Sequence, residues 1–390
     1  MCEPMLLNAL AFLPLLAWTY LLLGRGMFWL AGERDDRGAP DRSPQVWPSV
    51  AIVVPARDEA DVISRSIRAL AAQNYPGKTR IILVDDQSSD GTSDAARDAA
   101  ETSSAGDRLE ILPGLPLPSG WTGKLWALSQ GVEHACRDNA PDYLLLTDAD
   151  IGHSPGNLRR LIAKSEAGGL VLASLMVRLH CRTWPEQLMI PAFVFFFQML
   201  FPFAWVNDPQ RRTSAGAGGC MLIRRQALEA AGGIASVRAE IIDDCALAGR
   251  LKLQGPIWLG LTSNAKSLRP YRTLGEIGRM ISRSAYAQLG YSPRLLAGTV
   301  AGMVLIYLAP PLIALFGHGP AQVLGLAAWL IMAIAFLPML KFYRLSPLWG
   351  FALPATAALY TAFTVQSALE VWRGRGGMWK GRPQALVGHV

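Results

Sequence analysis

The sequence predicts an α/β protein in which a mainly parallel sheet is flanked by membrane helices. Short apolar segments alternate with helical ones over residues 49–150, and long apolar segments almost free of charge lie near both ends of the chain. Strands that are apolar along their whole length need cover on both faces, which the helices of a parallel sheet provide. The pattern therefore indicates one globular α/β domain between membrane segments.

Four short apolar segments are expected to form strands: Val50–Val54, Arg80–Val84, Leu109–Leu112 and Tyr143–Leu146. Between them, the sequence predicts the helices Asp61–Ala72, Ser89–Ala105 and Trp121–Ala135. The first helix carries its apolar residues on a single stripe, as an amphipathic helix does.

The composition narrows the classes of function. The chain is 51% hydrophobic and 17% charged, against about 25% charged residues in soluble domains. Its net charge of +7 suits anionic lipid headgroups or a negatively charged substrate. Nucleic-acid binding is not predicted, because Lys and Arg form no stripe with interleaved aromatic residues. The five cysteines form no C-x-x-C pair, so neither a zinc site nor a disulfide framework is expected.

The apolar segments predict an N-terminal anchor within residues 1–30 and three membrane helices within residues 295–371, followed by a basic tail over residues 372–390. Arginines crowd directly after the anchor, which places the next domain in the cytoplasm by the positive-inside rule. We therefore expect a multi-pass protein of the inner membrane. Four full crossings would put the basic tail outside, so we favour one incomplete crossing, at the interruption Pro310-Pro311. The number of crossings and the side of the tail stay open.

Acidic clusters follow three of the expected strands, at Pro55–Glu59, Asp85–Asp90 and Asp148–Asp150. In open sheets, ligands bind beyond the carboxyl ends of the strands. Carboxylates gathered there repel one another unless a cation or a ligand lies between them. The chain lacks G-x-G-x-x-G after the first strand and lacks G-x-x-x-x-G-K-[ST], so the phosphate loops of dehydrogenases and ATPases are absent.

Asp148 and Asp150 are the expected metal ligands. Two carboxylates one residue apart can hold Mg²⁺ or Mn²⁺, which bridges a diphosphate and neutralises its charge. A solvated turn is the alternative for an isolated D-x-D. The position after a buried strand, beside two other acidic strand ends, favours the metal site.

The motifs VVPARDEADVI from Val53, ILVDDQSSDGT ending at Thr92, LLTDAD from Leu145 and IIDDCALAGRLK from Ile241 resemble the family 2 glycosyltransferases. That family has the nucleotide-sugar fold called GT-A. The resemblance covers roughly residues 47–270 and implies a cytoplasmic GT-A domain over residues 45–290. The flanking apolar segments and the Trp379–Arg382 tail look most like the hopene-associated glycosyltransferases of bacteria.

The resemblance implies roles at the first two strands. Pro55, Arg57 and Glu59 would line the nucleotide pocket. Asp86 would accept a hydrogen bond from a pyrimidine base, with Asp85 beside it. Asp90 would order the loop, and an N-cap of the next helix is its alternative.

The resemblance also implies a donor site and a base. Lys124 and Asp148 would bind near the donor, although Lys124 also suits an exposed lysine at a helix start. Asp244 would act as the general base of an inverting transfer, because the acceptor hydroxyl must lose a proton as the sugar carbon is attacked. Asp243 is the alternative base or an orienting partner, and a helix cap is the structural alternative for both. Gly216–Cys220 would allow close approach to a ligand or form a tight packing turn.

One motif of the processive relatives is missing. Polysaccharide synthases of this family carry Q-x-x-R-W after the base, whereas Met280–Ser284 keeps only its arginine. Arg283, and less surely Arg279, would contact the diphosphate, although a juxtamembrane arginine would look the same. A single transfer is therefore favoured over polymer synthesis. His153 lies just after the metal motif and either approaches the site or is a satisfied loop histidine.

The apolar segment at residues 188–206 is also long enough to cross a membrane. A crossing there would separate Asp150 from Asp244, which the chemistry needs on one membrane face. Pro191, Gln198 and Pro202 suit a helix lying in the interface. We expect an interfacial or re-entrant segment that lets the domain reach a lipid acceptor.

Together these features predict a glycosyltransferase that moves one sugar from a UDP-sugar to a membrane lipid, such as a hopanoid. A polyprenyl-phosphate sugar synthase and a polysaccharide synthase are the alternatives within the enzyme class. A catalytically silent membrane scaffold is the non-enzyme alternative, and a transporter leaves the acidic strand ends unexplained. The sequence does not name the sugar, the lipid, the choice of Mg²⁺ or Mn²⁺, or the oligomeric state.

Overall fold

The structure is a computed structural model that describes residues 2–37, 44–103, 105–374, 378–379 and 382–383. The chain forms two compact units, each discontinuous in sequence. The sheet unit comprises Glu33–His180, Trp205–Pro270 and Gly377–Val390. The helical unit comprises Met1–Gly32, Cys181–Ala204 and Tyr271–Gly376.

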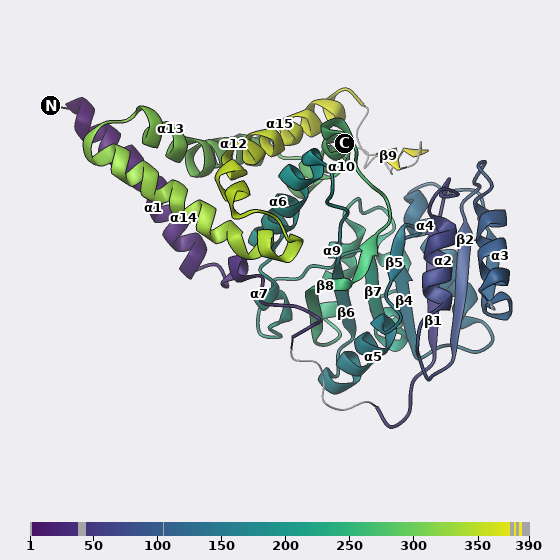
Figure 1. Ribbon diagram of the computed structural model, residues 1–390. Coiled ribbons are helices and arrows are strands. Elements are labelled where there is room, and N and C mark those ends of the chain that lie inside the picture. The colour runs from purple at the N-terminus through teal and green to yellow at the C-terminus, as the bar shows by residue number, and fades with distance from the viewer. Residues whose placement is uncertain (1, 38–43, 104, 375–377, 380–381, 384–390) are drawn as a thin grey trace. The chain divides into compact units, whose positions relative to one another are not determined.

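The described residues of the sheet unit form one sheet of eight strands in the order β3-β2-β1-β4-β7-β6-β8-β5 (Figure 1). The strands are β1 (Val50–Ala56), β2 (Thr79–Asp85), β3 (Leu109–Pro113), β4 (Tyr143–Thr147), β5 (Ile151–His153), β6 (Leu172–Arg178), β7 (Cys220–Arg224) and β8 (Ile257–Ser267). β1 pairs in parallel with β2 and β4, as β2 does with β3. The predicted mainly parallel α/β class is confirmed.

Strand β7 lies antiparallel between β4 and β6, which makes the sheet mixed. Its first residue, Cys220, therefore pairs with Thr147, the last residue of β4. Consequently, the loop before β7 lies at the same edge as the carboxyl end of β4. The sequence did not predict this strand, because the acidic motifs of the parallel half do not mark it.

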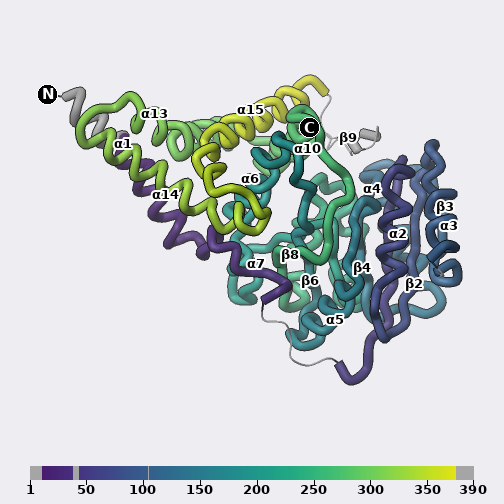
Figure 2. Tube along the Cα trace, in the orientation of Figure 1, coloured from purple at the N-terminus to yellow at the C-terminus, as the bar shows by residue number. Residues whose placement is uncertain are grey.

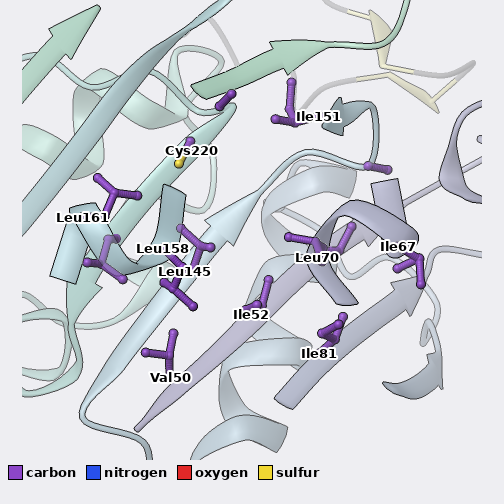
Figure 3. Packing of buried hydrophobic residues seen from close by; sticks show 14 of the residues in the cluster. Val50, Ile52, Ile67, Leu70, Ile81, Leu145, Ile151, Leu158, Leu161 and Cys220 are labelled. Atoms are coloured by element: carbon purple, nitrogen blue, oxygen red, sulfur yellow. The ribbon is translucent and has the colours of Figure 1, made fainter. Parts of the chain in front are cut away.

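Helices pack on both faces of the parallel half of the sheet. The helices and short 3-10 turns of the unit are α2 (Ile63–Ala71), α3 (Thr92–Thr102), η2 (Gly106–Arg108), α4 (Gly123–Cys136), α5 (Asn157–Gly168), α8 (Arg225–Ala230), η3 (Ile234–Val237) and α9 (Asp243–Lys252). Successive strand residues point to opposite faces. One face, with Ile52, packs against Ile67 of α2 and Leu158 of α5 in the main apolar cluster (Figure 3). The other face packs against α4.

Gly131 allows the close packing of α4 on the sheet. A Cβ atom at this position would lie 2.5 Å from Cγ1 of Val53 and 2.9 Å from Cγ2 of Val84, closer than carbon atoms pack. Both valines are buried in the centre of their strands, so neither can move aside easily. The glycine therefore sets how closely the helix approaches β1 and β2.

Gly131→Ala is expected to destabilise the protein despite the better helix propensity of alanine. Overpacking costs roughly 1–3 kcal/mol, and alanine returns about 1 kcal/mol of helix propensity. We expect a lower midpoint of thermal unfolding for the purified full-length variant in detergent. Gly106→Ala is the matched control, because a Cβ atom there meets nothing within 4 Å. An unchanged midpoint for Gly131→Ala would show that the helix moves without cost.

The described part of the helical unit consists of helices and short helical turns. They are α1 (Cys2–Leu23), η1 (Phe28–Leu30), α6 (Trp184–Leu200), α10 (Leu274–Ser282), α11 (Ala285–Gln288), α12 (Pro293–Met303), the π-helix η4 (Val304–Leu308), α13 (Ala309–Phe316), α14 (Gly319–Tyr343), η5 (Pro347–Ala352) and α15 (Leu353–Trp372). Helices α1 and α14 run side by side in this unit (Figures 1 and 2). The short helix α7 (Phe203–Asn207) spans the boundary between the units, and β9 (Met378–Trp379) pairs with β10 (Arg382–Pro383).

Three helices among the described residues are long and apolar enough to cross a membrane: Pro293–Phe316, Gly319–Tyr343 and Pro347–Trp372. They coincide with the three apolar segments expected near the C-terminus, so membrane association of this region is supported. The N-terminal helix contributes a shorter apolar stretch, Ala11–Leu23. The side chains before Ala11 and most of the basic tail lie outside the described residues.

The predicted interruption at Pro310 is a π-helical turn rather than a break. Proline has no N–H to donate to the carbonyl four residues earlier, which here belongs to Ile306. The indole Nε1 of Trp18, on α1, donates to that carbonyl at 3.0 Å. The first C-terminal helix thus continues through its prolines because a neighbouring helix supplies the missing donor.

Helix α6 contains most of the apolar segment 188–206 and packs within the helical unit. Phe195 contacts Phe336 of α14, and Phe196 contacts Tyr307 and Tyr360, with ring centroids 5.0–5.5 Å apart. It has 17 residues and is not among the described helices long and apolar enough to span. That it lies in the interface without crossing stays a prediction.

Candidate active site

A pocket of the sheet unit lies at the edge where β4 ends and where α4 and α9 begin. The polar residues that line it are Lys124, Thr147, Asp148, Asp243 and Asp244, with Gly218 beside them. Leucine and methionine side chains from α4, β4, β7 and α9 complete the wall. The pocket therefore combines residues that are more than a hundred positions apart in the sequence.

Lys124 joins the predicted donor site to the predicted catalytic pair. Its Nζ lies 2.9 Å from Oδ1 of Asp148 and 3.5 Å from Oδ2 of Asp243. Burial alone would lower the pKa of Lys124, but the two carboxylates outweigh it and raise the pKa above its usual value. The ammonium group is thus a fixed positive charge. The alternative of an exposed lysine at a helix start is wrong, since its side chain is only 20% exposed.

Asp244 is held in one orientation by two backbone groups. The N–H of Gly218 donates to Oδ2 at 2.9 Å, and the N–H of Cys245 donates to Oδ1 at 2.8 Å. Burial and the neighbouring charge of Asp243 raise the pKa of Asp244 to about 6, against the opposing effect of Lys124. A carboxylate with such a pKa can accept a proton near neutral pH.

The glycine-rich loop before β7 packs tightly against the start of α9. A Cβ atom on Gly216 would lie 2.8 Å from the backbone oxygen of Asp244. A Cβ atom on Gly218 would lie 3.1 Å from Nζ of Lys124 and 3.5 Å from Oδ2 of Asp244. Gly216 is therefore a packing position, whereas Gly218 borders the pocket and its approach to a ligand stays a prediction.

Asp150 lies beside Arg269, a residue that the sequence did not single out. Nε of Arg269 is 3.5 Å from Oδ2 of Asp150, and Nη1 is 3.6 Å from Oδ2 of Asp61. The same guanidinium contacts Oε2 of Glu59. Burial and Asp148 raise the pKa of Asp150, while Arg269 opposes the shift. Arg269 thus connects the loop after β1 with the metal motif.

The loops after β1 and β2 are bonded to each other. Nη1 of Arg57 contacts the backbone oxygen of Asp86 and lies 3.8 Å from its Oδ2. Pro55 and Asp86 are buried, and Glu59 is nearly so. None of these residues lines the pocket that holds Asp148 and Asp244, and their contact with a nucleotide stays a prediction.

Asp85 and Asp90 order the loop after β2. Asp85 accepts hydrogen bonds from the N–H of Ser88, at 2.9 Å, and from Oγ of Ser93. Asp90 accepts from the N–H of Ala60 at 3.0 Å and from the N–H of Thr92 at 3.1 Å. Because Asp90 bonds across to the first loop, its loop-ordering role is supported over that of a simple cap, and the N-cap position belongs to Gly91.

Comparison with known proteins finds a family that matches part of the chain. A sequence model of the family described as Glycosyl transferase family 2 matches residues 51–232, which is just under half of the chain. This segment is similar to a family 2 glycosyltransferase domain. The matched residues include Asp148 and Asp150 and end before the pair Asp243-Asp244. The match supports the predicted family over residues 51–232, whereas the narrower resemblance to hopene-associated enzymes is not shown.

Two curated relatives that match part of the chain are described as glycosyltransferases. The chain is 28% identical over 197 residues to an N-acetylglucosaminyltransferase of Mesorhizobium japonicum, which is 48% of this chain and 42% of the relative. It is 39% identical over 89 residues to the glycosyltransferase AglE of Haloferax volcanii, which is 23% of this chain and 27% of the relative. The chain thus spans less than half the length of these curated relatives.

The fold is shared with a mannosyltransferase from Pyrobaculum calidifontis, solved in complex with GDP-Man and Mn²⁺. The TM-score is 0.55 at 21% identity, over 93% of this chain and 99% of that one. The likeness therefore includes the apolar helices as well as the glycosyltransferase domain. At this identity it shows a common fold.

The glycosyltransferase domain offers two carboxylates that fit a divalent metal. Mg²⁺ is commonly held by one or two carboxylates together with the phosphates of a substrate. No group of three or more His, Cys, Asp or Glu side chains suited to a metal occurs among the residues that the structure describes. Asp148 forms an ion pair with Lys124, and Asp150 forms one with Arg269, so both carboxylates already bind cationic groups. A metal shared with a diphosphate fits this donor set.

Two predicted residues are not among those that line the pocket. Arg283 follows α10 in the helical unit, so its contact with a diphosphate stays a prediction. His153 ends β5 and is 5% exposed beneath the strand end of β4. It is a buried, hydrogen-bonded histidine, which agrees with the structural alternative for this residue.

Proposed function

We propose that this protein transfers one sugar from a nucleotide sugar to a lipid in the membrane, with inversion at the sugar carbon and with Mg²⁺ or Mn²⁺. The observation that carries the proposal is the single pocket in which Lys124 links Asp148 of the metal motif to the Asp243-Asp244 pair. A donor diphosphate and a base are needed within a few ångströms of one sugar carbon. This pocket brings a lysine that can bind the diphosphate close to a carboxylate that can act as the base.

The chemistry follows from the groups in the pocket. The acceptor hydroxyl oxygen forms a bond to the sugar carbon on the face opposite the diphosphate, and the carbon–oxygen bond to the diphosphate breaks. Asp244 takes the hydroxyl proton. The fixed positive charge of Lys124 stabilises the negative charge that grows on the leaving diphosphate. Asp148 and Asp150 would hold the divalent metal, which would neutralise further charge on the leaving group.

The acceptor is proposed to be a membrane lipid because three helices among the described residues are long and apolar enough to cross a membrane. A hydroxyl acceptor, such as that of a hopanoid or another polycyclic lipid, needs the base that Asp244 provides. A polyprenyl phosphate needs less help, since its oxygen is already charged. The arginines after the N-terminal helix support a cytoplasmic site at the inner membrane.

The test uses membranes that contain the full chain, a lipid extract and a panel of radiolabelled nucleotide sugars. UDP-glucose, UDP-N-acetylglucosamine and GDP-mannose separate the two nucleotide classes. We expect labelled lipid from one donor, lost with EDTA and restored by Mn²⁺ or Mg²⁺. Mild-acid treatment and the mass of the product separate a lipid glycoside, which resists it, from a polyprenyl-phosphate sugar, which is hydrolysed. No labelled product from any donor, with the protein folded, would favour the silent scaffold.

The pH dependence of transfer is expected to reflect Asp244. Its pKa is raised from the ordinary value of 3.8 to about 6, and only the carboxylate form accepts a proton. Activity should therefore fall as the pH falls through about 6 and reach a plateau above it. In Asp243→Asn, the repulsive neighbour is gone, so the acidic limb should move to lower pH. A wild-type limb near pH 4 would contradict the assignment of Asp244.

A further inference from the structure

Three buried polar side chains form a hydrogen-bonded line that begins at the wall of the pocket. Thr147 is the last residue of β4, His153 ends β5, and Asn157 begins α5. Their exposed fractions are 1%, 5% and 1%. The proposed chemistry uses none of these three side chains. Buried polar networks are kept where every member is satisfied and the arrangement is needed.

The donor and the acceptor of each hydrogen bond in this line can be assigned in only one consistent way. Oγ1 of Thr147 is 2.8 Å from the carbonyl oxygen of Gly219, which can only accept, so the hydroxyl proton points there. Nε2 of His153 is 2.9 Å from the same Oγ1 and must therefore donate to it. Nδ2 of Asn157 donates to Nδ1 of His153 at 2.9 Å. His153 is thus the neutral imidazole with its proton on Nε2.

The same line ends at the proposed base. Gly219 accepts from Thr147, and its neighbour Gly218 donates its N–H to Oδ2 of Asp244 at 2.9 Å. The two glycines are thus fixed on one side by β4 and on the other by the carboxylate. A side chain at Gly219 would lie 3.0 Å from Cγ2 of Val177, so the backbone has little room to shift.

We propose that His153 is a positioning residue for the transfer reaction: it fixes Thr147, which fixes the Gly218-Gly219 backbone and so orients Asp244 relative to Asp148. The inference rests on the proposed role of Asp244 as base. Thr147 precedes Asp148 directly, so the same contact sets both halves of the site. Misplacement of a catalytic group by about 1 Å can lower the rate by a factor of 100, so hydrogen bonds that fix the position of Asp244 can have a large effect on the rate.

Burial keeps the imidazole of His153 in one protonation state. It lowers the pKa of His153 to about 4, so the imidazole stays neutral wherever the protein is folded near neutral pH. The groups facing it, Thr147 and Asn157, are uncharged. A neutral Nε2–H donor is the form that the hydrogen bonds require.

The hydrogen-bond line can be tested without turnover. Spectra of the full-length protein, labelled with ¹⁵N-histidine in detergent micelles, should show a neutral Nε2–H tautomer at pH 7 that disappears in His153→Gln. The chain has five histidines, so this difference assigns the signal. In Thr147→Val the Nε2 resonance should shift. A proton on Nδ1, or no shift in Thr147→Val, would overturn the proposal.

Kinetics test the consequence for the base, with the donor that supports transfer in membranes. His153→Leu should lower kcat by about 10–100-fold, while the KM for the donor and the metal requirement change less than about twofold. His153→Gln keeps an N–H donor near the Nε2 position and should recover most of kcat. The double variant with Thr147→Val should lose little beyond either single one, because both act through one line.

A purely structural role predicts a different outcome. His153→Leu would then lower the unfolding midpoint but leave kcat at the wild-type value below that midpoint, which would refute positioning. Loss of the Gly218 hydrogen bond should also move the acidic limb of activity to higher pH. His134→Leu is the matched control, since His134 lies on α4, bonded to Glu110 at 2.6 Å and away from the pocket. If wild-type protein transfers no sugar at all, the proposed function is wrong, and the kinetic role of His153 is then wrong as well.

Discussion

Replacement of Asp244 by asparagine is expected to lower kcat for sugar transfer by about 1000-fold, because general-base catalysis contributes roughly 100- to 10,000-fold. Asparagine keeps the shape of the side chain and one oxygen for the N–H of Gly218, which now bonds to Oδ2 at 2.9 Å. Its amide cannot take a proton from the acceptor. The chemical step should therefore fail while the pocket stays folded.

The measurement combines turnover with donor binding. The amount of labelled lipid formed per minute should fall. The affinity of the purified variant for UDP with Mn²⁺, measured by calorimetry, should stay within about threefold of wild type, because Asp244 is not expected to bind the donor diphosphate. Asp94→Asn is the matched control, because Asp94 is 81% exposed on α3. Activity retained in Asp244→Asn but lost in Asp243→Asn would transfer the role of base to Asp243, the alternative that the sequence left open.

Motifs at strand ends made the parallel half of the site predictable. Each acidic cluster follows an apolar segment, and parallel strands bring their carboxyl ends to one edge. The structure places Asp148 directly after β4, at the pocket. Asp243 and Asp244 begin α9 instead, and they were predicted through the family resemblance rather than from a strand end. Local patterns were sufficient here because topology alone determines where strand ends meet.

Other features depend on contacts that leave no local pattern. Arg269 meets Glu59 and Asp150 from positions more than a hundred residues away, and nothing around it in the sequence marks an ion pair. The antiparallel β7 brings Gly218 to Asp244, a contact that neither segment indicates alone. The boundary of the helical unit at Tyr271 falls before the apolar spans, so α10 and Arg283 belong to that unit rather than to the sheet unit that holds the pocket.

Replacement of both Asp148 and Asp150 by asparagine is expected to weaken metal-dependent nucleotide binding by more than about 100-fold. Even residues behind the ligands of a metal typically contribute 10- to 100-fold to its affinity, and these two carboxylates are the proposed ligands themselves. The fold should survive, because Lys124 keeps Asp243 as a partner at 3.5 Å and Arg269 keeps Asp61 at 3.6 Å. Loss of binding would then reflect the lost ligands rather than unfolding.

Calorimetry with UDP, in the presence of Mn²⁺ or of EDTA, distinguishes this role from others. Wild-type protein should bind UDP tightly only with the metal, whereas the double variant should bind equally weakly in both conditions. Asp61→Asn is the control, since Asp61 faces the same arginine but is 66% exposed and is not a proposed ligand. Tight UDP binding by wild-type protein in EDTA would show that Lys124 and Arg269 hold the diphosphate without a metal. In that case the two aspartates would serve to position these basic groups, because each already lies in an ion pair with one of them.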